Sequence, residues 1–87
     1  MIEVKKFSAA WCGPCKALAP IFENVKSKFD NIKFESIDVD EQFEIASKYV
    51  IRSVPTVIIE RDGKEIERFA GVQSEMTYIN SLNEHIK

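Results

Sequence analysis

The segment Trp11-Cys12-Gly13-Pro14-Cys15-Lys16 marks the point at which the pattern of the chain changes. Before this segment, the residues from Ile2 to Phe7 alternate between two faces in the manner of a β-strand. After it, apolar side chains recur every three or four residues, as on one face of a helix: Leu18, Ile21, Phe22, Val25 and Phe29. Pro14 suits the first turn of that helix, where its missing N–H is not needed. The segment is therefore expected to join a strand to the N-terminus of a helix.

The middle of the chain predicts a second strand and a short helix. The strand is expected from Ile32 to Val39, with Phe34 and Ile37 in the core. Asp40 is a good N-cap for a helix from Glu41 to about Tyr49. That helix is expected to carry an apolar stripe: Phe43, Ala46 and Val50.

The last third of the chain predicts a hairpin and a final helix. Pro55 to Ile59 is β-prone, and proline is tolerated at the first residue of a strand. Asp62-Gly63 accepts the positive φ angles of a type I′ turn, so Glu65 to Phe69 is expected to return antiparallel. Ser74 can cap the helix that follows. The expected apolar face of this helix is Met76, Ile79, Leu82 and Ile86.

These elements follow the order β-α-β-α-β-β-α and predict a single domain over residues 1–87. The first two strands are expected to be parallel, with a right-handed crossover, because a helix joins them. The last two are expected to be antiparallel, because a tight turn joins them. The predicted fold class is therefore α/β, with a mixed four-stranded sheet flanked by helices.

The composition excludes several classes of function. The net charge is −2 and the pI about 5.4, so no basic patch for nucleic acid is expected. The apolar runs are too short to span a membrane, and the first residues show no targeting segment. We therefore expect a cytoplasmic monomer. A cytosolic chain with 2 cysteines points to redox or metal chemistry and away from a static disulfide.

The two cysteines fit thiol–disulfide exchange. Cys12 at a helix N-terminus meets unpaired N–H groups and the positive end of the helix dipole, so its pKa is expected below the free value of about 8.5. We interpret Cys12 as the attacking thiol. Cys15 lies one turn later on the same side and can resolve the mixed disulfide. A buried structural pair and a zinc site are the alternatives, but zinc needs more ligands and only His85 remains as a non-carboxylate candidate.

The sequence resembles the thioredoxin family from Ile2 onwards. Trp11-Cys12-Gly13-Pro14-Cys15-Lys16 is similar to the active-site signature of that family. Pro20, eight residues after Cys12, resembles the proline that kinks the first helix of the motif. Ser53-Val54-Pro55-Thr56 resembles the family's cis-proline loop, and Gly71 resembles the glycine that lines its substrate groove. The resemblance implies a minimal thioredoxin fold.

The resemblance also implies roles around the two thiols. Gly13 and Pro14 would set the loop geometry and favour a reductant. Trp11, if it is not simple core, would shield the dithiol and contact substrate. A cis Val54–Pro55 bond would let the backbone of Val54 pair with an extended substrate segment. The expected apolar rim of the substrate groove, around Gly71, is Trp11, Val39, Val54, Ala70 and Val72.

Two features depart from the family pattern. The chain lacks the strand and helix with which typical thioredoxins begin. Lys6 stands where they carry a buried Asp, and Ser36 stands at the position of its usual Lys partner. Lys6 shares a face with Ile2 and Val4, which leaves two alternatives. Its stem packs on the core with its ammonium in solvent, or it lies under the active site and changes the pKa values of the thiols. As a cation it would lower the thiol pKa values; as a neutral amine it would accept the proton of Cys15.

The functional prediction is a thioredoxin-like protein disulfide reductase without a bound cofactor. Its partners would be disulfide-containing proteins, and its electrons would come from a flavin- and NADPH-using thioredoxin reductase. One alternative is a glutaredoxin-like enzyme reduced by glutathione, favoured by the short chain but not by Gly13-Pro14 or the single Gly71. Another is a binding module in which the cysteines are idle.

Overall fold

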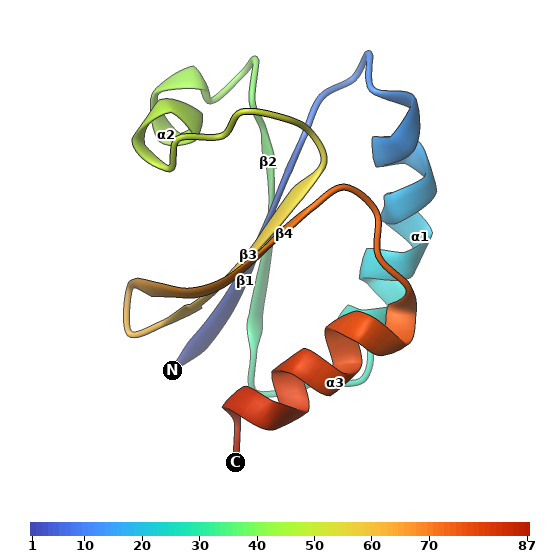
Figure 1. Ribbon diagram of the computed structural model, residues 1–87, viewed down its shortest axis with the longest axis vertical. Helices are drawn as coiled ribbons and strands as arrows, with labels where there is room; N and C mark the ends of the chain where they lie inside the picture. Colours follow the sequence, from blue (N-terminus) through green and yellow to red (C-terminus); the bar gives the residue numbers. More distant parts are fainter.

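The computed structural model describes residues 1–87 and confirms the predicted order of elements (Figure 1). The strands and helices are β1 (Ile2–Ser8), α1 (Gly13–Lys26), β2 (Lys33–Asp38), α2 (Phe43–Lys48), β3 (Thr56–Arg61), β4 (Lys64–Ala70) and α3 (Glu75–His85).

The four strands form one mixed sheet in the order β2-β1-β3-β4. β1 runs parallel to β2 and antiparallel to β3, and β3 runs antiparallel to β4. Asp62 and Gly63 have φ angles of 51° and 83°, as the predicted type I′ hairpin turn requires. The parallel pair and the hairpin that the sequence predicts are both confirmed.

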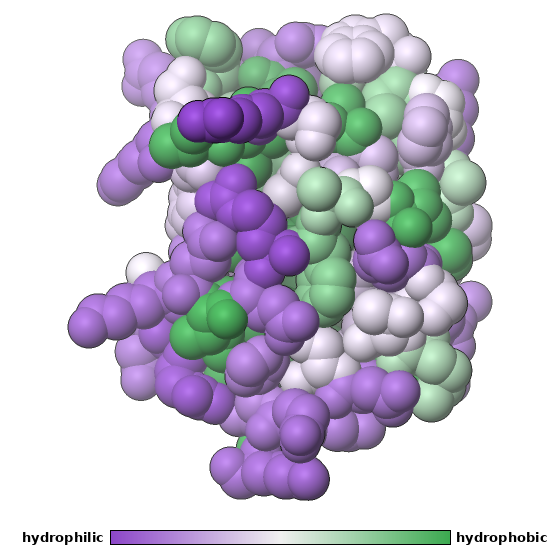
Figure 2. All heavy atoms as spheres, viewed as in Figure 1, coloured by the Kyte–Doolittle hydropathy of each residue, from purple (hydrophilic) through white to green (hydrophobic).

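The main core lies between the sheet and the two longer helices, which cover the same face (Figure 1). Leu18, Phe22 and Val25 of α1 pack there with Tyr78 and Leu82 of α3. On the opposite face, Tyr49 and Ile51, which follow α2 in the chain, pack against a smaller apolar cluster. In the view of Figure 2, hydrophobic side chains reach the surface only as small separate patches among hydrophilic ones.

The short helix differs most from its prediction. It begins at Phe43, its N-cap is Gln42, and no side chain caps it. Asp40 therefore does not act as the N-cap. Phe43 is 69% exposed, and Val50 lies beyond the helix with a φ of 54° and is also exposed. Of the predicted stripe only Ala46 is buried, because a helix of 6 residues presents one position to the sheet and little more.

The longer helices differ in smaller ways. α1 runs through Pro20 and ends at Lys26, one turn earlier than expected, although Phe29 still packs against the core. Ser74 caps α3 as predicted, its side chain accepting a hydrogen bond from the backbone N–H of Thr77. The predicted apolar face of α3 is confirmed in part, because Leu82 is buried and Ile79 packs against the core. Tyr78 and Leu82 are buried, whereas Met76 and Ile86 are exposed.

Candidate active site

The two cysteines lie at the start of α1 and form a disulfide. Cys12 is the N-cap, and its sulfur accepts a hydrogen bond from the backbone N–H of Cys15 at 3.2 Å. The N–H of Cys12 donates in turn to the carbonyl of Ala9 at 3.2 Å, which closes the turn that leads from β1. The position of Cys12 at the helix N-terminus is therefore as the sequence predicts. There, free N–H groups favour negative charge on sulfur once the disulfide is reduced.

The disulfide is less accessible than a loop position suggests. Cys12 is 4% exposed and Cys15 is 5% exposed, and both pack with Ala9 against Val39 and Val54. Gly13 and Pro14, by contrast, are exposed. In the oxidised state, neighbouring apolar side chains therefore leave little of either cysteine exposed to solvent.

The loop before β3 lies directly against the dithiol. The Val54–Pro55 bond is cis, as the resemblance implies, and Pro55 is buried. The carbonyl oxygen of Val54 lies 3.6 Å from Cys12 Sγ, a separation at which a reduced Cys12 can donate a weak hydrogen bond. The backbone N–H of Val54 donates to no acceptor within the chain. Val54 therefore has one free backbone donor beside the sulfur.

Gly71 joins the same region from the end of β4. Its N–H donates to the carbonyl of Pro55 at 2.8 Å, and its φ of 80° is one that glycine adopts without strain. Val72 follows and is partly exposed. The structure thus brings Val54, Pro55 and Gly71 together, although they lie far from the cysteines in the sequence.

Trp11 is a surface residue and not part of the core, since 71% of it is exposed. Its Nε1 donates to Asp40 Oδ2 at 2.9 Å, so Asp40 holds the indole instead of capping α2. A groove of about 200 Å³ begins at Trp11 and is lined further by Val39, Ile51, Arg52, Ser53 and Val54. The sequence reading missed Asp40, Ile51 and Arg52 in this place. The only indication in the sequence is that Asp40 follows the second predicted strand and that Ile51 and Arg52 directly precede the cis-proline loop.

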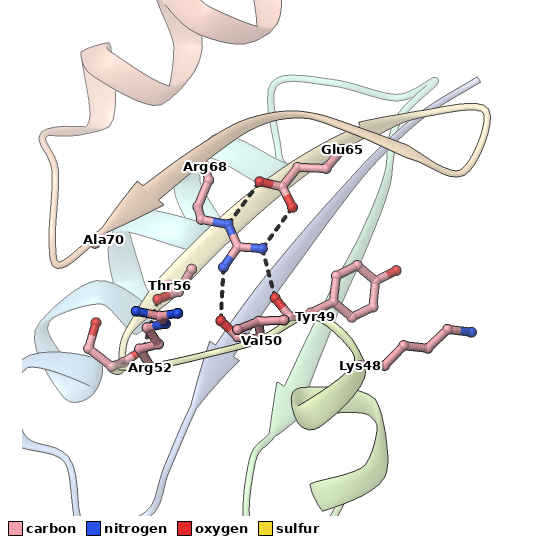
Figure 3. Close-up of a pocket in the computed structure, with 9 residues that line it drawn as sticks. Lys48, Tyr49, Val50, Arg52, Thr56, Glu65, Arg68 and Ala70 are labelled. Carbon is pink, nitrogen blue, oxygen red and sulfur yellow. Dashed lines mark hydrogen bonds and ion pairs between the residues drawn. The ribbon is translucent and has the colours of Figure 1, made fainter.

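Arg68 of β4 forms hydrogen bonds with the segment that leads into the cis-proline loop (Figure 3). Its guanidinium donates to the carbonyls of Tyr49 at 2.8 Å and Val50 at 3.3 Å. It also forms two hydrogen bonds with Glu65, which raise the pKa of Arg68 and lower that of Glu65. A cavity of about 570 Å³ lies beside this bridge and reaches Thr56. No pattern in the sequence indicates this role of Arg68.

Lys6 lies on the α1 face of the sheet, as its alternation with Ile2 and Val4 predicts. It is 8% exposed, and its Nζ is 4.9 Å from the centroid of the Phe22 ring. Ser36 is its neighbour in register on β2. Burial lowers the pKa of Lys6, and the negative charge of Glu23 partly opposes that change. Its stem is buried, yet its ammonium is neither hydrogen-bonded nor sealed from water, as in the alternative with the stem packed on the core and the ammonium in solvent.

The fold and this site together define a class of protein. A mixed sheet that presents a Cys-x-x-Cys disulfide at a helix N-terminus, against a cis-proline, is the framework of a thiol–disulfide oxidoreductase. Residues 2–84 match the thioredoxin family model, and the chain belongs to the thioredoxin family. Members of this family are protein disulfide oxidoreductases, and they generally act on disulfide substrates together with thioredoxin reductase.

Individual relatives are similar in sequence and structure, and each is longer than this chain. The chain is 38% identical to a thioredoxin of Bacillus subtilis over 86 residues, which cover 98% of this chain and 83% of that protein. It is 34% identical to a thioredoxin of Chlamydia caviae over 79 residues, covering 91% and 78%. A mutant thioredoxin from Halobacterium salinarum superposes with a TM-score of 0.92 at 34% identity, covering 99% of this chain and 75% of that one. Fasciola hepatica thioredoxin superposes with a TM-score of 0.89 at 36% identity, covering 97% and 80%.

The structure contains no helix of the length and apolarity needed to cross a membrane.

Proposed function

We propose that this protein reduces disulfides in other proteins, with Cys12 as the nucleophile and Cys15 as the resolving thiol. The Cys12 thiolate attacks one sulfur of the substrate disulfide; a mixed disulfide forms and the first substrate thiolate leaves. The Cys15 thiolate then attacks Cys12 Sγ, which forms the Cys12–Cys15 bond and releases the second substrate thiolate. Two electrons pass to the substrate, whose thiolates take up protons from water. The observation that carries this assignment is the position of Cys12 Sγ, between the N–H of Cys15 and the carbonyl of Val54.

The substrate would bind across the cis-proline loop. The N–H of Val54 has no partner in the chain, so an extended substrate segment can accept from it, as in a short strand addition. Pro55 and Gly71, joined by their own hydrogen bond, would hold Val54 in place. Trp11 and Val72 offer exposed apolar surface for the residues that flank the substrate cysteine.

The electron donor would be a flavin- and NADPH-using thioredoxin reductase, as the family membership supports. The protein would then work as a cytoplasmic monomer that carries no cofactor of its own. Glutathione is the donor in the competing glutaredoxin-like function.

A disulfide reduction assay with insulin tests the proposal. We expect turnover when NADPH and thioredoxin reductase supply electrons, and much slower turnover with glutathione and glutathione reductase. Cys12→Ser is expected to abolish turnover. Cys15→Ser is expected to trap a mixed disulfide between Cys12 and substrate, visible as a covalent adduct that dithiothreitol releases. Adduct formation by Cys12→Ser instead of Cys15→Ser would reverse the two roles, and equal rates with glutathione would favour the glutaredoxin-like function.

A further inference from the structure

A second opening reaches the dithiol from another side. This rear cleft has a volume of about 250 Å³ and shares no lining residue with the groove that begins at Trp11. It is bounded by Cys15 and Lys16 of α1, by Lys6 of β1 and by Asp38 of β2, and small side chains form the rest. Cys15, and not Cys12, is therefore among the residues that line this cleft with charged side chains.

Lys6 is the least exposed of the charged residues that line the rear cleft. No carboxylate lies within ion-pair distance of its ammonium, whereas the neighbouring Lys5 has three such partners. The face of the Phe22 ring beneath Nζ favours the protonated form of Lys6. From α1 the charged groups near Lys6 are Glu23, which also favours the cation, and Lys16 at the exposed mouth of the cleft.

Asp38 is the one carboxylate among the residues that line the rear cleft, and its charge is already engaged. Its Oδ1 accepts hydrogen bonds from the backbone N–H groups of Asp40 at 2.8 Å and Glu41 at 3.1 Å. These donors offset the negative charge of Asp38. The cleft then holds two uncompensated charges, those of Lys6 and Lys16, and water screens the charge of the exposed Lys16 more strongly.

We propose that Lys6, acting through its charge across the rear cleft, stabilises the thiolate of Cys15 and so controls the resolving step. The inference rests on the proposed function, in which Cys15 attacks Cys12. Lys6 takes no part in the bond changes: the Cys15 S–H proton leaves through the cleft to water, the Cys15–Cys12 bond forms, and the substrate sulfur departs with its electron pair. The ammonium only makes the thiolate form of Cys15 more populated.

This role has a predictable direction. A cation beside the dithiol favours the thiolate over the uncharged disulfide, so it stabilises the reduced protein and weakens it as a reductant. Loss of the charge is expected to raise the pKa of Cys15 and to make the protein a stronger reductant. A purely structural role of Lys6 would change stability but not these two properties.

The first test is a thiolate titration by absorbance near 240 nm in a Cys12→Ser background, where Cys15 is the only thiol. Lys6→Met is expected to reduce the thiolate fraction of Cys15 at neutral pH by roughly three- to tenfold. Lys6→Arg keeps the charge and is expected to stay close to the parent protein. Lys64→Met removes the same charge from the exposed start of β4, at the other end of the sheet from the dithiol, and is expected to change nothing.

The second test is the redox equilibrium of the intact Cys12–Cys15 pair with dithiothreitol. At a pH where Cys15 of the parent protein is mainly thiolate, Lys6→Met is expected to shift the equilibrium constant by up to the same factor, roughly 15–30 mV towards stronger reduction. Equal results for Lys6→Met and Lys64→Met in both tests would overturn the inference, and so would a Lys6→Arg protein that behaves like Lys6→Met. Failure of the parent protein to exchange with any dithiol would instead refute the proposed function. The titration of Cys15 would still report on Lys6 in that case.

Discussion

The two faces of the sheet are closed by different means. On the face covered by α1 and α3, nine buried residues form one continuous apolar cluster. On the other face, the buried apolar cluster contains only Phe7, Ile37 and Ile58. α2 has 6 residues and lies over one end of the sheet (Figure 1). The rest of that face is occupied by charged side chains that pair with each other.

Lys5 is at the centre of this charged cluster. Its Nζ lies 2.8 Å from Glu3 and 2.5 Å from Glu60, and a third carboxylate, that of Glu35, is at 4.0 Å. Glu60 also accepts a hydrogen bond from Tyr49 at 2.6 Å. Burial lowers the pKa of Lys5, but the hydrogen bonds and charges of its partners outweigh burial, so the net change is upward. Lys5 and Lys6 are adjacent in the chain and experience opposite environments, because successive residues of a strand face opposite ways.

The apolar face is expected to carry the larger share of stability, and Leu18→Ala tests this most strongly. Leu18 is fully buried in the cluster between α1 and the sheet. Its truncation removes buried methyl groups and leaves a cavity, so we expect a loss of about 3 kcal/mol in the free energy of unfolding. Urea unfolding monitored by circular dichroism measures the loss. Met76→Ala on the exposed side of α3 is the control, expected within about 0.5 kcal/mol of the parent protein. Equal effects of the two variants would contradict the difference between exposed and buried positions.

The contribution of the charged face to stability is expected to come from ion pairs and not from buried apolar area. Lys5→Met leaves the carboxylate of Glu60 buried without its ammonium partner, at an expected cost of about 2 kcal/mol. Adding Glu60→Gln removes the unpaired charge and keeps an acceptor for Tyr49, so the double variant is expected to recover more than half of the loss. Lys33→Met, an exposed change of equal charge, is the control. A double variant less stable than Lys5→Met would show that Glu60 stabilises this face without Lys5.

The arrangement of the two faces could be predicted from the sequence only where a pattern is long enough. Alternation along β1 correctly separates Ile2, Val4 and Lys6 from Glu3, Lys5 and Phe7. The period of α1 is read over several turns, and its buried residues follow from it. The 6 residues of α2 offer too few turns for the same reasoning, so the prediction that Phe43 belongs to an apolar stripe facing the core is wrong. On α3, the prediction correctly places Ile79 and Leu82 against the core, and the contact of Tyr78 with Phe69 adds a buried position that the predicted apolar face does not include.

In the active site too, features formed by residues close in sequence could be predicted, whereas contacts between distant residues could not. Cys12 and Cys15 lie within one turn of sequence, and the geometry between them follows from the helix that begins there. The approach of Val54 and Pro55 could be expected only from resemblance to a family. The bond from Trp11 to Asp40 spans 29 residues and that from Arg68 to Tyr49 spans 19, so no local pattern contains them. Such contacts depend on the register of strands, which the sequence leaves open to a shift of a residue or two.

At alkaline pH, the contributions of Lys5 and Lys6 to stability are expected to change in opposite directions. These changes are smaller than the effects of the substitutions above. The folded protein holds the proton of Lys5 above the ordinary pKa of 10.5, so the stability that Lys5 contributes is complete below that pH and declines above it. For Lys6, the folded protein loses the proton before the unfolded chain does. The penalty for burying its charge therefore disappears as the pH rises towards 10.5.

Unfolding of the oxidised protein in urea between about pH 8 and 11.5 measures this contrast, and the disulfide leaves no thiol to titrate. Relative to Lys6→Met, the parent protein is expected to gain stability up to pH 10.5. Relative to Lys5→Met, it is expected to lose stability above pH 10.5. Tyr49, whose pKa is raised by burial and by Glu60, titrates in all three proteins, so the differences between proteins are compared and not the curves themselves. If the stability differences for Lys5→Met and Lys6→Met changed with pH in the same way, the two lysines would have similar electrostatic environments. The two faces of the sheet would then differ only in their apolar packing.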